Sequence, residues 1–95
     1  MAENNLVLQP QLFVGIDIAR NTATCATASS LKAVGKPFTF PQTPGGFTEL
    51  KTILLAQQPD PAHCLVVMEA TGTYWMKLAL DLFEADFKLS VINPN

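Results

Sequence analysis

The 95-residue sequence has little positive charge: six Lys and Arg residues stand against eight Asp and Glu residues, giving a formal net charge of −2. A protein that grips nucleic acid over a wide surface needs a strongly basic face, so this composition argues against a large nucleic-acid footprint. Long apolar runs are also missing, because no stretch approaches the roughly 18 residues of a membrane span. The first ten residues have neither a basic segment nor a long apolar one, so we expect no secretory signal.

Cysteine and histidine are scarce too, with two and one residues in the chain. Cys25 and Cys64 lie far apart in segments with strand character, where a disulfide is conceivable but buried free thiols are the simpler prediction. His63 lies beside Cys64, but a zinc site would need two more ligands at suitable spacing. We therefore expect reduced cysteines, no zinc, and a cytoplasmic protein.

What the sequence does contain is apolar residues, which make up 48% of the chain and are too many for a disordered segment. A typical domain holds roughly 100–150 residues, so the chain is one domain at most. We expect that single domain to span residues 1–95, with residues 1–11 as a flexible amino-terminal tail.

Three strands are predicted in the first half of the chain. Residues 12–18 are apolar on both faces, as in a central strand that is covered on both sides. Residues 22–29 alternate small apolar and hydroxyl residues, which favours an antiparallel partner for the first strand. Residues 36–40 form a short third strand, and Pro37 and Pro41 place it at an edge of the sheet.

Two helices and two further strands are predicted in the second half. Thr43 and Pro44 are typical of an N-cap and a first helical position, and the prolines that follow Gln58 end this helix. Residues 64–68 are a short apolar run, read as a buried strand that ends at Glu69. A second helix over about residues 74–85, with the stripe Trp75, Leu78, Ala79, Leu82 and Phe83, precedes a last strand over residues 87–92.

The element order β-β-β-α-β-α-β predicts an α/β fold with a mixed five-stranded sheet. Right-handed crossovers make the last two strands parallel to the first and place the fourth strand beside it. This order of elements is the one found in the ribonuclease H-like fold.

Two acids stand where burial should exclude them. Asp17 lies inside the apolar first strand and Glu69 closes the apolar fourth strand. If these strands are neighbours, both carboxylates reach the carboxyl end of a parallel pair, where open α/β sheets bind ligands. Mg²⁺ (or Mn²⁺) would relieve the repulsion between them and could support phosphodiester cleavage.

A purely structural role for both acids is equally open at this point. Asp17 could accept hydrogen bonds from the turn at residues 20–22, and Glu69 could cap the helix after Gly72. Of the two aromatic residues that follow, Trp75 belongs to the core stripe, whereas Tyr74 is the better candidate for touching a ligand.

Four motifs stand in an order and spacing that one protein family shares. The chain resembles the amino-terminal RuvC-like domain of the DEDD transposases of insertion-sequence family 110, which includes site-specific DNA invertases. Gly-Ile-Asp alone is a weak signal, whereas Glu-Ala-Thr-Gly followed by two aromatic residues is specific. The motifs are Val14–Ala19, Phe40–Phe47, Val67–Trp75 and Val91–Pro94.

The resemblance implies a transposase or recombinase that binds Mg²⁺ with four acids and cuts and joins DNA. Asp17 matches the first acid and Glu69 the second, as catalytic and metal-binding residues. The other two aspartates, in a helical region beyond the Asn-Pro motif, and a carboxy-terminal domain with a serine important for recombination are not in this sequence. We therefore expect a truncated domain, inactive alone, whose family partners are DNA and a guide RNA that bridges donor and target.

Two alternatives stay open. A nucleotide-binding domain of the actin and sugar-kinase type shares the element order, but residues 19–22 lack the glycines of a phosphate cradle. The chain could also be a non-catalytic interaction module that joins an intact transposase protomer. Because a further helix would cover part of the sheet in a complete fold, we expect an exposed apolar patch here and self-association through it.

Overall fold

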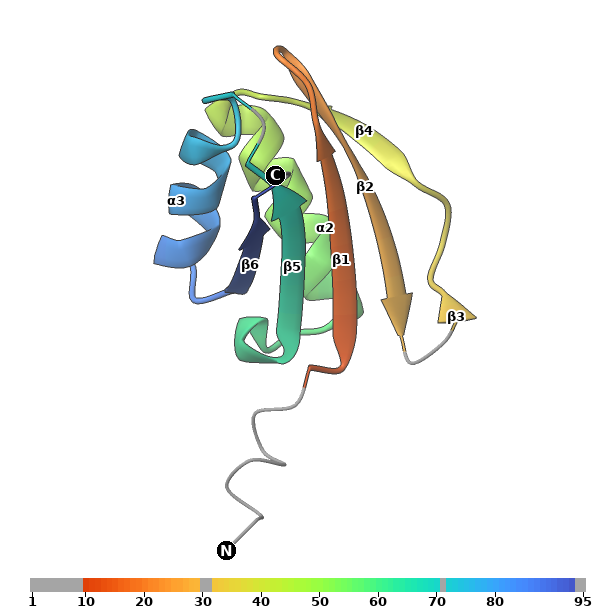
Figure 1. Cartoon of the computed structure of the whole chain (residues 1–95). Coiled ribbons are helices and arrows are strands. Elements are labelled where there is room, and N and C mark those ends of the chain that lie inside the picture. Colours follow the sequence, from red (N-terminus) through yellow and green to blue (C-terminus); the bar gives the residue numbers. More distant parts are fainter. Residues whose placement is uncertain (1–9, 30–31, 71, 94–95) are drawn as a thin grey trace, which may run out of the picture.

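Two helices pack against one face of a mixed β-sheet (Figure 1). The computed structural model describes residues 10–29, 32–70 and 72–93. Core residues from both helices and from alternate positions of the strands form one cluster, so both helices lie on the same side of the sheet. The elements are β1 (Leu12–Ile18), β2 (Thr22–Ser29), β3 (Lys32–Ala33), β4 (Phe38–Pro41), α2 (Pro44–Gln57), the 3₁₀ turn η1 (Pro61–His63), β5 (Cys64–Glu69), α3 (Met76–Glu84) and β6 (Lys88–Ile92).

The strand pairing agrees with the α/β prediction and its ribonuclease H-like arrangement. β1 pairs antiparallel with β2 and parallel with β5, and β5 pairs parallel with β6. β4 pairs with β2, and within the described residues no strand lies on its other side, as its prolines predicted. The two-residue strand β3, which also pairs with β2, was not predicted.

The described residues cover one face of β1 and leave the other open, so the prediction of cover on both sides was wrong. Leu12, Val14 and Ile16 are buried under the helices, whereas Phe13 is 39% exposed. The apolar run suggested a strand that is buried on both faces, but its outward positions hold only one large apolar side chain. β2 shows the same one-sided pattern, with buried and exposed residues in strict alternation over most of its length.

Helix α2 begins and ends where the sequence predicted. Thr43 is its N-cap, and the Thr43 hydroxyl accepts a hydrogen bond of 3.0 Å from the main-chain N–H of Gly46. Gly46 is buried against the end of β4, and a Cβ added there would overlap the carbonyl oxygen of Pro41. The helix can therefore approach the edge strand only because residue 46 has no side chain.

Helix α3 is shorter than predicted and buries a narrower stripe. It spans Met76–Glu84 and buries Leu78, Ala79 and Leu82, with Trp75 packed against the core from just before the helix. Phe83 is 67% exposed, so its place in the predicted stripe was wrong. One residue after Leu82, it points about 100° away from that face, and the buried aromatic is instead Phe87, beyond the helix.

Both cysteines are free and fully buried, as predicted. Burial raises the pKa of the Cys25 thiol to about 12 and, with the nearby charge of Asp60, that of Cys64 to about 11. Both thiols therefore stay protonated and unreactive at neutral pH while the domain is folded.

The amino-terminal end of the described chain is tied to the domain. Gln11, which the prediction placed in a flexible tail, donates its main-chain N–H to the carbonyl oxygen of His63 at 2.8 Å. Its side-chain oxygen accepts a further hydrogen bond from Gln58. Residues 1–9 of the predicted tail lie outside the described residues.

Among the helices of the described chain, none has the length and apolar character that crossing a membrane requires.

The two neighbouring glycines of α2 give a matched test of this packing. We expect Gly46→Ala to lower the free energy of unfolding by about 2 kcal/mol, because the new methyl group meets backbone rather than a movable side chain. Gly45→Ala has open space, with Thr43 Oγ1 nearest at 3.9 Å, and should raise stability by about 0.5 kcal/mol. Urea denaturation measures both, and equal effects of the two substitutions would contradict this account.

Candidate metal centre

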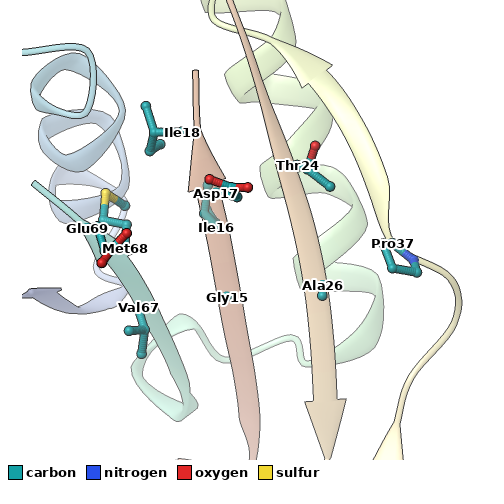
Figure 2. A pocket seen from close by; sticks show the side chains of 10 residues that line it. All are labelled: Gly15, Ile16, Asp17, Ile18, Thr24, Ala26, Pro37, Val67, Met68 and Glu69. Carbon is teal, nitrogen blue, oxygen red and sulfur yellow. The ribbon is translucent and has the colours of Figure 1, made fainter. Parts of the chain in front are cut away.

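The two acids that the sequence singled out lie side by side at the carboxyl ends of β1 and β5. These strands pair in parallel with Gly15 opposite Val67 and Ile16 opposite Met68, so Asp17 and Glu69 come next in register. Both lie two residues beyond the Gly15–Val67 pair, which places them on the same face, the one opposite the helices. Figure 2 shows them at the ends of neighbouring strands.

Neither carboxylate is buried, which corrects the premise that drew attention to them. Asp17 and Glu69 are both exposed, because the face of the sheet that carries them has no covering layer within the described residues. The structural alternatives also find no support there. Within the described residues no hydrogen bond from residues 20–22 reaches the Asp17 carboxylate, and α3, whose N-cap is Trp75, has no side-chain cap hydrogen bond.

The acids border a shallow hollow of about 610 Å³ on the open face (Figure 2). Small residues form its floor, with Gly15 on β1 and Ala26 on β2. Thr24 lies directly opposite Asp17 on β2, where its hydroxyl contacts that of Thr39 at 3.1 Å. Pro37 closes the far side. Sequence reasoning did not single out Thr24, although the alternation of β2 places it on the same face as Asp17.

The donor set suits a hard divalent cation. Mg²⁺ is commonly held by one or two carboxylates and keeps several waters or substrate oxygens for its remaining positions. Asp17 and Glu69 offer such oxygens, and within the described residues no Lys, Arg or His forms an ion pair with either one. Within the described residues there is no group of three or more His, Cys, Asp and Glu side chains that could hold a metal ion, so the candidate site consists of this pair.

One glutamine joins the loops that leave the two acid-bearing strands. The side-chain amide of Gln42 donates to the carbonyl oxygen of Ala19, after β1, at 2.8 Å and to that of Tyr74, after β5, at 3.0 Å. Its main-chain N–H donates to the carbonyl oxygen of Asn21 at 2.8 Å. Gln42 therefore fixes the two loops relative to each other, and only the structure reveals this role.

The loop after β5 places two aromatic residues in different environments. Gly72 adopts a left-handed conformation (φ 59°), and its carbonyl oxygen accepts a hydrogen bond of 3.1 Å from the Trp75 indole. Trp75 thereby packs on the core, whereas Tyr74, which the sequence placed off the core stripe, is 45% exposed. Arg20 and Lys77 lie beside Tyr74 around a small cleft, and sequence reasoning passed over both.

The described chain thus combines a ribonuclease H-like sheet with two acids at the ends of adjacent parallel strands. Comparison with known proteins narrows the class: the family profile of the DEDD transposases of the IS110 type, described as transposase, matches residues 14–95. The chain belongs to this transposase family.

Characterised relatives point to the same family. The chain is similar to the pilin gene-inverting protein of Moraxella bovis, with 36% identity over 83 residues, which cover 86% of this chain and 25% of the relative. It is 33% identical to the pilin gene-inverting protein of Moraxella lacunata over 82 residues, with the same shares of the two chains. The chain thus spans about a quarter of the length of the curated relatives it matches.

Among solved structures, the chain has a distant likeness to the Aquifex aeolicus member of the Ppx/GppA protein family. The TM-score is 0.42 at 12% sequence identity, and the match covers 88% of this chain and 35% of that one. Similarity at this level supports no inference about function.

The role of Gln42 can be tested against a second glutamine. Gln42→Ala removes two hydrogen bonds and should lower the free energy of unfolding by about 1 kcal/mol. Gln57→Ala, in the exposed last turn of α2, is the matched control and should change it by less than about 0.5 kcal/mol. Urea denaturation followed by the emission of Trp75 measures both; a Gln42 variant as stable as the control would remove its clamping role.

Proposed function

We propose that this chain is the amino-terminal part of the catalytic domain of a transposase or site-specific recombinase that cuts and joins DNA with Mg²⁺. The observation that carries this proposal is the placement of Asp17 and Glu69 on adjacent parallel strands, on one face and without a partner among the described residues. Membership of the transposase family supports the reaction class.

In this proposal Asp17 and Glu69 hold Mg²⁺ or Mn²⁺ through their carboxylate oxygens. When bound, the ion supplies Lewis-acid stabilisation of the charge that develops on a phosphodiester oxygen. The chain's own contribution is to position two negative charges on a rigid pair of strands. The low floor of Gly15 and Ala26 leaves space for a substrate phosphate above the sheet.

The 95-residue chain alone is proposed to be inactive. Phosphoryl transfer by this class of enzyme generally uses two ions about 4 Å apart. Two carboxylates are too few to hold such a pair, and the further two aspartates that the family resemblance implies are not in this sequence. DNA, and a guide RNA as in the family, are the proposed partners of the longer protein, and the cytoplasm, where bacterial DNA lies, is its proposed location.

Mn²⁺ binding tests the acid pair separately from activity. We expect the chain to bind Mn²⁺ weakly, in the millimolar range, and Asp17→Asn or Glu69→Gln to weaken binding by about tenfold. Electron paramagnetic resonance of free Mn²⁺ measures this. Asp86→Asn, an exposed acid after α3, is the matched control and should bind as the unchanged chain does. Equal binding by all variants would refute the metal site.

Incubation with supercoiled plasmid and Mg²⁺ or Mn²⁺ tests inactivity. We expect the plasmid to stay supercoiled, because the set of acids is incomplete. Efficient nicking that disappears in Asp17→Ala would show instead that the two carboxylates suffice.

We also propose that two copies of the chain associate through the apolar part of the open face, beside the hollow that the acids border. Phe13, Ala28 and Val67 line a shallow depression there that is almost entirely apolar. A two-fold dimer would place the same apolar residues of both copies against each other, and burying them would remove apolar surface from water.

Sedimentation velocity over a wide range of protein concentration tests this association. We expect a concentration-dependent dimer that Phe13→Ser weakens. Leu55→Ser, which changes a similarly exposed apolar residue on α2, should leave the dimer intact. A monomer at every concentration, or equal effects of both substitutions, would rule out this face.

A further inference from the structure

A small basic cleft lies between the first turns of the two helices, separate from the hollow that the acids border. It has a volume of about 270 Å³, and its lining comes from the turn after β1, the residue after β4, the loop after β5 and both helices. The lining residues are Arg20, Gln42, Phe47, Thr73, Tyr74 and Lys77.

The two cations of the cleft carry charge that the domain does not neutralise. Lys51 forms an ion pair of 2.8 Å with Asp81, which links α2 to α3. Arg20 and Lys77, by contrast, are exposed, and neither has an ion pair with any residue of the described chain. No Asp or Glu lines the cleft. In a chain of net charge −2, two unpaired cations on one small concavity indicate an anionic ligand.

The donors and the size of the cleft fit one phosphate group. A guanidinium can donate two parallel hydrogen bonds to phosphate oxygens, and an ammonium adds a compact positive charge. The hydroxyl groups of Thr73 and Tyr74 are further donors, and the Tyr74 ring offers a surface for a base or sugar. Pockets for whole small molecules usually exceed roughly 300 Å³, so a single phosphate with its sugar fits better than a free nucleotide.

The cleft and the acid pair occupy the same end of the sheet. Arg20 follows Asp17 by one short turn at the end of β1, and Tyr74 lies in the loop that leaves β5 after Glu69. The Gln42 amide bonds the main chain of both loops, at Ala19 next to Arg20 and at Tyr74 just before α3, so it ties the backbone near the cations to the ends of the acid-bearing strands. A strand crossing this edge would meet the carboxylates on one side and the cations on the other.

We propose that Arg20 and Lys77 bind one backbone phosphate of a nucleic-acid strand and so align the neighbouring phosphate at the acid pair. This proposal rests on the proposed function in one respect: it takes the bound strand to be the substrate of the transposase. The phosphate chemistry itself does not require the metal, so binding can be tested without it.

Fluorescence anisotropy with a labelled short single-stranded oligonucleotide, in low salt with EDTA, tests the cleft. The double variant Arg20→Gln/Lys77→Gln should raise Kd by about tenfold. In the double variant, the slope of log K against log salt concentration should be smaller in magnitude by about 0.7, the value for one neutralised phosphate on a single strand. The control Lys36→Gln/Lys88→Gln makes the same change in net charge at exposed lysines elsewhere and should bind nearly as the unchanged chain does.

Absence of binding by the unchanged chain, an unaltered Kd in the Arg20/Lys77 variant, or an equal loss in the control would overturn the proposal. Circular dichroism establishes that the variants fold, as expected for exposed side chains without ion pairs. Asp17→Asn should retain binding in EDTA, so a failure of the metal site leaves this result standing. Parallel titrations with DNA and RNA oligonucleotides identify the preferred strand, and equal affinity would place recognition in the phosphate alone.

Discussion

The parallel pairing of β1 with β5 is the constraint on which the rest of the structure depends. It joins segments that are far apart in the chain, requires a crossover through α2 and fixes the register in which Asp17 and Glu69 become neighbours. The side-chain alternation of the pleat then decides that both acids share a face, away from the helices. Since the strands are held by main-chain hydrogen bonds and by the core beneath them, the separation of the carboxylates does not depend on the carboxylates themselves. The strands therefore hold Asp17 and Glu69 next to each other although no cationic side chain of the described residues pairs with either one.

Much of this arrangement could be predicted from the sequence. The elements other than β3, and the helix start at Thr43, follow from residue patterns, capping and proline placement, and the neighbourhood of the two acids follows from crossover handedness. What failed were statements about how many layers cover a strand. Residues 12–18 read as covered on both sides, yet Phe13, Gly15 and Asp17 face outward, because an apolar run does not say whether a partner layer is present. Phe83 was also predicted to be buried, but the buried aromatic position near that end of the helix is filled by Phe87.

The residues that sequence reasoning missed act through contacts between distant loops. Gln42 is an ordinary polar residue before a helix until the ends of β1 and β5 are known to lie within reach of its amide. Arg20 and Lys77 likewise become a pair only when the turn after β1 approaches the first turn of α3. Such roles have no local pattern, because they depend on tertiary proximity alone. Tyr74 was the exception, since its position off the core stripe already set it apart from Trp75.

The reactivity of the two buried, protonated thiols can report how the domain opens. Cys25 lies on β2 and Cys64 at the start of β5, so the two flank β1 from opposite sides, and both are sealed beneath the helices. A thiol-specific reagent can modify either one only after the sheet or its helical cover has separated. Modification of both at one rate would mean that the sheet opens as a single cooperative unit. Different rates would show which flank of the central strand gives way first.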